Sequence, residues 1–513
     1  MEKDNAFRSL LFARGYLLTS NPNNVAEEIG VLSDWKKRKL RSFTLFTHPE
    51  SDFHVYEVEK RTWLLIGHAF DPWEKIAGEK QILEGLSQAY ADSEEQFYHA
   101  LDRLTGRFAL YCIKNDGGGF VVQDAVGLKN VYFLNNQDEI WFASHSQLLA
   151  DIHRLQQDPD IHRMVNSFFY GIGIRHLPGI HSPFREISMV SANTLLHFPS
   201  FQRKRFFPRN ENLQSNDLDG LAQQIGEPMR RSFDLLVQKK KLALSLSIGT
   251  DSRVTFSASK EHQSNIHYFS YISDTEEKRD ATKAAKMCQE LGMKHHLYSV
   301  PVEEIKQKDD LNDFIDLLNQ NSAHIRNPTI TEICKLYYLY NNFPKGLMEV
   351  KTPISEIGRA IYCKKTGRKK MPDKLKPRNM SNLYKRNMFD RKSLKFMDSA
   401  FNQFIKATNF GENFYNYEEH DLFYWEHRNT AWASLANQDH DIIHDMTSIF
   451  NNREILKLFL ATSRKHRISD DLHREVIRYL WPDALKIPLG KSPTIKDKVR
   501  KVGERVFFAV NRF

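Results

Sequence analysis

The segment that most constrains this chain is LALSLSIGTDSRVTFSASK, at residues 242–260. Residues 242–246 alternate Leu, Ala and Ser after three lysines, which is typical of a buried strand that starts at a charged surface. A turn with Gly and Ser follows, and residues 253–260 can continue as a helix. A strand, a tight turn and a helix start direct unpaired backbone N–H groups and the positive helix end at one point. The segment therefore predicts an anion-binding site.

The turn also carries side chains that suit phosphate and a divalent cation. Its hydroxyl donors are Ser247, Thr250 and Ser252, and the carboxylate of Asp251 suits a Mg²⁺ ion that bridges phosphates. The alternative is an ordinary strand–turn–helix with polar turn residues, and six residues alone do not decide between the two.

This turn, SIGTDS, resembles the pyrophosphate loop S-G-G-x-D-S of the N-type ATP pyrophosphatases, and within that group the loop of the asparagine synthetases. The matching positions are Ser247, Gly249, Asp251 and Ser252. Ile248 stands where the family usually has its first glycine. The resemblance implies that the loop binds the pyrophosphate of ATP. It also implies that Phe269 and Ser270, at the end of the following strand, line an adenine pocket with backbone groups.

Length and composition bound the rest of the interpretation. A chain of 513 residues exceeds the size of one hydrophobic core, so two domains are expected. The net charge of +9 suits an anionic ligand such as ATP, and no nucleic acid is expected as a partner. The four cysteines are widely spaced without a CxxC pair, so neither a disulfide framework nor a zinc site is expected. Because no apolar run is long enough to span a membrane and the first residues are charged, we expect a cytoplasmic protein.

Residues 1–208 are expected to form an α+β domain. Apolar or alternating runs predict strands at 62–69, 107–113, 120–123, 131–134 and 139–144, with a hairpin turn at 115–119. Helical periodicity predicts helices at 81–90 and 94–104.

The order of these pieces resembles the N-terminal glutaminase domain of the asparagine synthetases, which has an Ntn-hydrolase-like fold. The residues that carry this resemblance are Gly106, Arg107, Phe108, Asp124, Gly127, Tyr132, Ala143, Ser144, Gly179 and Ile180. Active glutaminases of the family use an N-terminal cysteine as nucleophile and its own α-amine as base. Here position 2 is Glu2, and the first cysteine, Cys112, lies in an apolar strand. The domain is therefore expected to be a scaffold, as in the β-lactam synthetases and lasso-peptide cyclases, which also lack the nucleophile.

The polar segment 203–219 is expected to end the first domain, and residues 217–513 to form the second. An amphipathic helix around residues 218–229, which Pro228 should bend, leads into the strand at 242–246. Further strands are predicted at 265–272, 295–300 and 347–350, with a helix at 280–291. This alternation predicts an α/β domain with a doubly wound parallel sheet, as in the N-type ATP pyrophosphatases, and a helical extension from residue 392.

A second group of polar residues follows the strand at 347–350. By resemblance, Ser355 and Glu356 stand at a Gly-Asp-Glu element whose aspartate binds the second side of magnesium pyrophosphate, so that aspartate is missing. Glu356 is then the candidate metal ligand or the base for an incoming amine, and Arg359 the candidate for neutralising the leaving pyrophosphate. An ion pair between Glu356 and Arg359 at a helix start is the alternative.

Three later segments complete the prediction. Residues 364–378 carry eight basic residues with Gly and Pro, and are expected to be a mobile loop, either solvated surface or a cover over the substrates. By resemblance, the Asn-Asn-Arg element at 451–453 closes the substrate side of the cleft. The resemblance also places a late lysine on the α-phosphate or the developing oxyanion, with Lys491 the first candidate and Lys486 the second.

Residues 496–513 are expected to form a basic amphipathic helix. Its apolar face consists of Val499, Val502, Val506, Val510 and Phe513. Such a face docks on the chain's own core or on a second subunit, in a homodimer, or lies on an anionic membrane surface or another partner.

Together these features predict an ATP-dependent amide-forming synthetase, a carbon–nitrogen ligase that releases AMP. A small-molecule or peptide carboxylate is adenylated, pyrophosphate leaves, and ammonia or an amine receives the acyl group, with ATP and Mg²⁺ required. One alternative is an asparagine synthase that uses ammonia or an external glutaminase. Another is a non-catalytic nucleotide-binding scaffold, suggested by Ile248 and Ser355. A tRNA-modifying pyrophosphatase is a further alternative, against which the degenerate glutaminase-like half argues.

Overall fold

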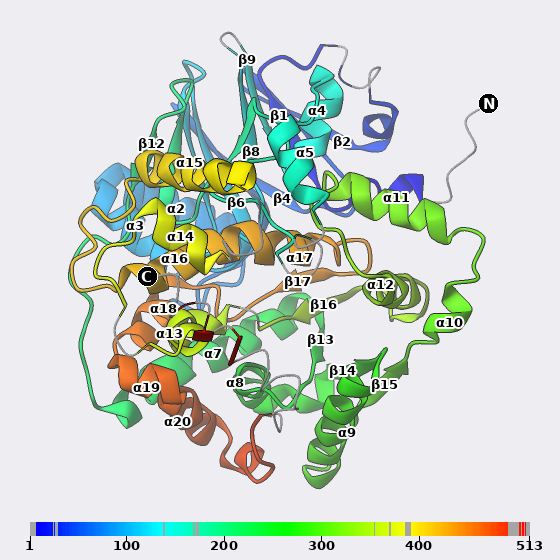
Figure 1. The fold of residues 1–513 in the computed structure, drawn as a ribbon. Coiled ribbons are helices and arrows are strands. Elements are labelled where there is room, and N and C mark those ends of the chain that lie inside the picture. Colours follow the sequence, from blue (N-terminus) through cyan, green and yellow to red (C-terminus); the bar gives the residue numbers. More distant parts are fainter. Residues whose placement is uncertain are drawn as a thin grey trace.

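The structure is a computed structural model that contains three β-sheets (Figure 1). The residues that it describes are 7–23, 25, 29–136, 139–167, 170, 174–352, 354–368, 371–384, 391–490, 502, 503, 505, 506 and 508. Two antiparallel sheets come from the first part of the chain, and a parallel sheet with most of the helices comes from the second part.

The strands expected from the alternating runs belong to two six-stranded antiparallel sheets. The first sheet has the order β10 (Ile187–Met189), β8 (Tyr132–Asn136), β9 (Glu139–Ala143), β1 (Tyr16–Thr19), β3 (Phe43–Thr47), β2 (Lys36–Leu40). The second has the order β12 (Arg203–Arg205), β11 (Thr194–Phe198), β7 (Gly119–Gln123), β6 (Thr105–Lys114), β5 (Arg61–Phe70), β4 (Phe53–Val58).

The two antiparallel sheets pack face to face between helices. Alternate residues of β5 point to opposite faces, so Leu64 and Ile66 join the core between the sheets, while Trp63 and Leu65 pack beneath helices. The helices on that outer side are α2 (Glu79–Asp92) and α3 (Glu94–Asp102), and α4 (Ser146–His153) covers the other sheet. This part of the chain therefore has four layers, helix, sheet, sheet and helix, followed in sequence by α5 (Pro159–Val165) on the first sheet's side.

The parallel sheet is doubly wound. Its order is β15 (His296–Ser299), β14 (Ile266–Ile272), β13 (Lys241–Ser245), β16 (Leu347–Val350), β17 (Asp445–Thr447), and every neighbouring pair is parallel. One face packs on α7 (Leu218–Lys239), α8 (Thr250–Ala258) and α9 (Thr275–Glu290). The other packs on α11 (Leu311–Asn321) and α12 (Ile330–Asn342), which follow the short α10 (Val302–Ile305). Because helices cover both faces, the strands carry near-continuous apolar residues.

Most of the remaining helices form a helical extension, which packs in part on α7 and α8. They are η4 (Ser355–Arg359), α13 (Ile361–Thr366), α14 (Pro377–Leu383), α15 (Arg391–Thr408), α16 (Glu419–Phe423), the π-helix η6 (Tyr424–Ala433), α17 (Ser434–Gln438), α18 (Arg453–Leu460), α19 (Arg464–Ser469) and α20 (Asp471–Leu480). Figure 1 shows α17 and β17, the edge strand of the parallel sheet, on the side of that sheet nearest the antiparallel sheets.

The predicted strands of both parts are confirmed within two residues at each end. Helix α9 begins earlier than predicted because Asp274 caps it by accepting hydrogen bonds from Glu276 and Glu277 N–H, both at 2.8 Å. Helix α7 runs through Pro228 as one continuous helix. The last strand of the antiparallel part ends at Arg205, and α7 begins at Leu218.

The prediction of a loop at residues 364–378 is wrong at both ends of the segment. Lys364 and Lys365 belong to α13, and Pro377 and Arg378 belong to α14. Pro377 occupies the first position of its helix, where a missing N–H costs nothing, so it begins a helix instead of breaking one.

The Asn-Asn-Arg element, predicted to close the substrate side of the cleft, contacts the antiparallel part. Asn451 Nδ2 donates to the Gly106 carbonyl at 2.5 Å and to Asp124 Oδ1 at 2.8 Å. Asn452 Nδ2 donates to the Arg103 carbonyl at 2.6 Å. These side chains are fully buried, so they tie the two parts of the chain together.

A buried ion pair lies at the same interface. The Arg107 guanidinium on β6 binds the Asp441 carboxylate through both terminal nitrogens, and Nη2 donates to Oδ2 at 2.7 Å. Both side chains are about 4% exposed. Burial alone would lower the pKa of Arg107, but Asp441 outweighs it and raises that pKa.

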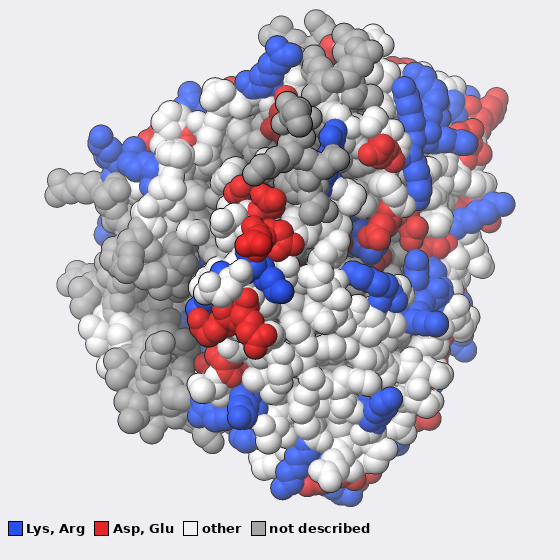
Figure 2. Space-filling view, turned by 90° about the vertical axis from the view of Figure 1, so that its right-hand side faces the viewer, with Lys and Arg blue, Asp and Glu red and all other residues white. Residues whose placement is uncertain are grey.

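The surface and the last residues of the chain bear on the partners that the sequence predicts. Among the described residues, no helix is both long enough and apolar enough to cross a membrane. The side of Figure 1 where α10 and α11 lie carries interspersed basic and acidic side chains (Figure 2). In the last segment, Val502 and Val506 are exposed and Phe508 is buried in the core, whereas Val499, Val510 and Phe513 lie outside the described residues.

We expect Arg107→Met to lower the free energy of unfolding by about 3–5 kcal/mol, because Asp441 would remain buried without its partner. The double variant Arg107→Met/Asp441→Leu should recover part of this loss, because it removes the stranded charge. Urea unfolding followed by circular dichroism measures both. Lys80→Met, which removes an exposed pair with Glu84, is the control and should change stability by less than about 1 kcal/mol. An equal loss in the single and double variants would contradict the role of the pair.

Candidate functional site at the carboxyl ends of the parallel strands

The strand order of the parallel sheet decides where a ligand fits. The chain leaves β13 toward β14 on one side and returns to β16 on the other, so the order reverses between β13 and β16. At such a switch point the loops after the two strands diverge and leave a crevice at the carboxyl ends. The loop after β13 is the predicted pyrophosphate loop, and η4 follows β16.

The two loops meet at this crevice. Ser355 Oγ, in η4, donates a hydrogen bond to Asp251 Oδ1 in the first turn of α8, and the Arg359 guanidinium binds Asp251 Oδ2. The structure thus brings together three residues singled out from separate parts of the sequence. The carboxylate of Asp251 is about one-fifth exposed.

The start of α8 has the features of an anion site. No side chain caps this helix, so the first-turn N–H groups have no intrahelical acceptor. Ser247 Oγ and Ser252 Oγ lie 2.9 Å apart, and Ser252 Oγ also donates to the Ser247 carbonyl at 2.9 Å. These hydroxyls hold the turn in shape, whereas the side chain of Thr250 is partly exposed.

The isoleucine in place of a glycine does not block the turn. The side chain of Ile248 is 1% exposed, so it points into the protein, and its carbonyl accepts a hydrogen bond from Gly490 N–H at 2.9 Å. Arg253, one turn further along α8, donates to the carbonyl of Ile487 at 3.1 Å. The turn is therefore supported from beneath by residues 484–490.

Arg359 is the centre of a group of charges. Its Nε and Nη2 donate to the two oxygens of Asp470, each at 2.9 Å, while Nη1 binds Asp251. Lys364 also binds Asp470. Burial would lower the pKa of Arg359, but hydrogen bonding to Asp470 and the charges of Asp251 and Glu356 outweigh it and raise that pKa. The guanidinium is therefore charged and fixed beside the loop.

Two carboxylates of the group differ in their response to this environment. Burial raises the pKa of Asp251, although the Arg359 charge opposes the shift. Burial also acts to raise the pKa of Asp470, but its bonds to Arg359 and Lys364 outweigh burial and lower it. Asp251 is thus the carboxylate that gains most from a further cation.

Glu356 is held apart from Arg359 by its own partner. Tyr424, on η6, donates its hydroxyl to Glu356 Oε2, and burial followed by the Glu356 charge raises the pKa of Tyr424 well above its usual value. Arg359 bonds to Asp251 and Asp470, so the alternative of a Glu356–Arg359 ion pair is not what forms among the described contacts. Glu356 acts on Arg359 and Asp251 through charge only.

The other predicted residues lie around the loop or away from it. Phe269 accepts Leu246 N–H at 2.8 Å through its carbonyl, and Ser270 Oγ donates to the Leu246 carbonyl at 2.8 Å. Lys486 is 72% exposed and pairs with Asp483 on the surface at 2.7 Å, so its ammonium does not join the group around Arg359. Lys491 lies outside the described residues.

A cavity of about 300 Å³ opens at the carboxyl ends of β13, β14 and β16, beside the predicted loop. Phe269 lines it, as do four polar residues absent from the sequence prediction: Glu349, Lys351, His440 and His444. The two histidines are four residues apart, a spacing that puts both on one face of a helical turn and that a search for paired ligands in the sequence would have found.

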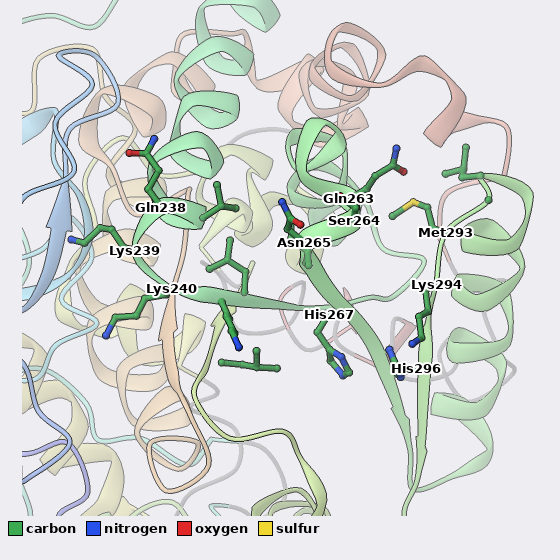
Figure 3. A pocket seen from close by; sticks show the side chains of 17 residues that line it. Gln238, Lys239, Lys240, Gln263, Ser264, Asn265, His267, Met293, Lys294 and His296 are labelled. Carbon is green, nitrogen blue, oxygen red and sulfur yellow. The ribbon is translucent and has the colours of Figure 1, made fainter.

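A larger cavity, of about 950 Å³, lies at the opposite end of the sheet (Figure 3). It is lined by the first residues of β13, β14 and β15, with Lys240, His267 and His296 among the labelled side chains. Because ligands of doubly wound sheets bind at the carboxyl ends, this position argues against the larger cavity as the reaction site.

Comparison with known proteins agrees with the class that this geometry defines, an α/β protein with an anion site at the switch point of a parallel sheet. Residues 226–342 match the family model named Asparagine synthase. This range contains β13, the predicted loop, β14, α9 and β15, and ends before η4. This segment is therefore similar to the asparagine synthase family, and it makes up less than half of the chain.

Solved structures give only slight similarities, and no curated protein matches the chain. One is the glutamine phosphoribosylpyrophosphate amidotransferase from B. subtilis complexed with ADP and GMP, at 11% identity and a TM-score of 0.23. Another is described as the allosteric regulatory enzyme of purine biosynthesis, at 9% identity and a TM-score of 0.24. Each match covers 52% of this chain and 61% or 60% of the other, less than two thirds of its length. At these scores the similarity identifies neither a fold nor a function.

We expect Arg359→Met to lower the free energy of unfolding by about 3 kcal/mol at pH 7 and by less at pH 3. The lowered folded pKa of Asp470 provides stability that is complete above the unfolded aspartate pKa of about 4 and is lost as the pH falls through the folded pKa. The variant lacks this contribution, so the difference from the unmodified protein shrinks in acid.

Urea unfolding at several pH values measures this dependence. Arg474→Met is the control, because Arg474 pairs with Asp471 at 3.2 Å near the same helix but is about half exposed. A loss that is independent of pH would show that Arg359 acts through packing alone.

Proposed function

We propose that this protein is an ATP-dependent synthetase that forms an amide bond from a carboxylate and an amine. The observation that carries the proposal is the meeting of the loops after β13 and β16, through Asp251, Ser355 and Arg359, at the switch point of the sheet. The match of residues 226–342 to the Asparagine synthase family model supports the same chemistry.

The first step of the proposed reaction forms an acyl-adenylate. A carboxylate oxygen of the substrate attacks the α-phosphorus of ATP, the bond between the α- and β-phosphates breaks, and pyrophosphate leaves. The first-turn N–H groups of α8 are proposed to bind the leaving group, and the charge of Arg359, which binds Asp251 in that turn, supports this role. The nucleoside would occupy the cavity of about 300 Å³ that Phe269 lines.

The second step transfers the acyl group. The amine nitrogen attacks the acyl carbon, the bond to the phosphate oxygen breaks, AMP leaves, and the amine loses a proton. Glu356 is the proposed acceptor of that proton, with Tyr424 orienting its carboxylate. Lys491, the residue after Gly490 that bonds to the loop, is proposed to stabilise the developing oxyanion, with Lys486 as the less favoured candidate.

Mg²⁺ fits the donor set of this site in part. Burial raises the pKa of Asp251, and a bound metal ion would stabilise the charged form of this carboxylate. Both of its oxygens, however, already accept bonds from Ser355 and Arg359. When bound with ATP, the ion would neutralise phosphate charge, with Asp251 and Glu356 as its proposed protein ligands. The engagement of Asp251 is also the observation that favours a second candidate function, a nucleotide-binding scaffold without activity.

The antiparallel part is proposed to be a glutaminase-like scaffold. All four cysteines are buried, which argues against a reactive thiolate at any of them. At Cys112, burial raises the pKa to about 12. Its family-like residues instead serve the interface, as Arg107 binds Asp441 and Asp124 binds Asn451. The proposed nitrogen donor is therefore ammonia or an amine; an asparagine synthase is the special case with aspartate and ammonia.

Pyrophosphate release tests the proposal. Across a panel of carboxylates with ammonia or simple amines, we expect ATP-dependent release for at least one pair, with AMP formed in equal amount. Asp251→Asn should lower the rate on the order of 100-fold, because it removes a charge beside the reacting phosphates. Asp313→Asn, at an exposed position of α11, is the control and should keep the full rate. ATP binding without pyrophosphate release for any pair would favour the scaffold.

The nitrogen donor is tested separately. With the active carboxylate, we expect ammonium or an amine to support AMP formation and glutamine alone to support none, because no thiol of the chain is placed to release ammonia. A coupled assay for glutamate detects glutaminase activity directly. Glutamate formation that tracks the purified protein would overturn this assignment.

A further inference from the structure

The turn at residues 440–445 has two polar faces. His444 N–H bonds to the His440 carbonyl at 3.2 Å, so this segment makes one helical turn and the residues four apart lie on the same side. Asp441 and Asp445 face the antiparallel part, where they meet Arg107 and His68. His440 and His444 line the 300 Å³ cavity on the other side.

A buried carboxylate completes the group of histidines. Glu349, on β16, is 3% exposed, and its Oε2 lies 2.6 Å from His444 Nε2. One ligand atom from each of Glu349, His440 and His444 lies within 4.8 Å of the others. Two imidazoles and one carboxylate, with the remaining directions open to a cavity, form the donor set of a catalytic zinc site or of another first-row divalent ion.

The histidines retain unused nitrogen atoms. Nδ1 of His440 and Nδ1 of His444 are buried and have no hydrogen-bond partner among the described residues. Unpaired buried polar atoms are costly, so their presence at a cavity wall indicates a missing partner.

Lys351 occupies the place of a cation in the metal-free arrangement. Its ammonium lies 3.3 Å from Glu349 Oε2, and its side chain is 13% exposed. A divalent ion that binds Glu349 would therefore displace the ammonium from this carboxylate. By contrast, the other described group of possible ligands, Glu418, His420 and Asp421, is bound by Arg464 and Arg467.

We propose that Glu349, His440 and His444 form a site for a divalent transition-metal ion, with Zn²⁺ the first candidate, and that Lys351 is the internal cation that the metal replaces. The ion would keep coordination positions open toward the cavity for water or a ligand. This site is separate from the predicted Mg²⁺ ligand Asp251 and does not depend on the proposed synthetase activity. The cysteine spacing, from which no zinc site was expected, does not bear on a set of His and Glu ligands.

Calorimetric titration of the chelator-treated full chain with Zn²⁺, in the absence of nucleotide, tests the site. We expect one tightly bound ion per chain. His440→Gln should weaken binding about 100-fold or more. His296→Gln, at the opposite end of the sheet, is the matched control and should bind as the unmodified chain does.

Lys351→Met distinguishes this site from adventitious binding. Removing the competing ammonium should tighten Zn²⁺ binding and enlarge the rise in melting temperature that Zn²⁺ produces, whereas a site elsewhere would be unaffected. Visible absorption of bound Co²⁺ that is lost in His440→Gln provides a second readout. Equal Zn²⁺ affinity in the unmodified protein and His440→Gln, or weaker binding in Lys351→Met, would overturn the proposal. Because no ATP is present, either result leaves the pyrophosphate experiment unaffected.

Discussion

The buried pair of Arg107 and Asp441 is the contact on which the arrangement of both parts depends. Charges at about 4% exposure are stable only with a partner in good geometry, so the pair fixes the turn at 440–445 against β6. That turn leads directly into β17, the edge strand of the parallel sheet, whose Asp445 meets His68 of the antiparallel part at 3.5 Å. The fixed turn therefore sets both the edge of the sheet and the wall of the cavity at its carboxyl end.

In the loop region, too, partly buried carboxylates are stabilised by a positive charge. Asp251, Glu356 and Asp470 act on one guanidinium, that of Arg359, and their mutual repulsion would be costly without it. By its resemblance to the Gly-Asp-Glu element of the asparagine synthetases, this segment has Ser355 in place of an aspartate. A carboxylate at that position would have added a negative charge to the group around Arg359. Because Ser355 is neutral, it adds no negative charge that would offset the positive charge of Arg359 beside the loop.

Local patterns in the sequence predicted the elements well because each depends on short-range information. Alternation located β5, β6 and β13, and the S-x-G-x-D-S turn located the start of α8. What the sequence did not reveal depends on distant pairs: β17 has only three residues and is stabilised by β16, and the Asn451 and Asn452 amides find their acceptors more than 300 residues away. The sequence does not reveal the two partners of Arg359 for the same reason, since Asp251 and Asp470 are each more than 100 residues from it.

Two carboxylates at the ends of neighbouring strands, Asp251 after β13 and Glu349 on β16, are each paired with a cation of the chain itself, Arg359 and Lys351 respectively. The two cations are not equivalent. The Arg359 guanidinium is held by two carboxylates, Asp251 and Asp470, through a planar group that stays protonated at physiological pH. The Lys351 ammonium, by contrast, is a single point charge on a flexible side chain, 3.3 Å from Glu349. The positive charge beside Asp251 is therefore the more firmly fixed of the two.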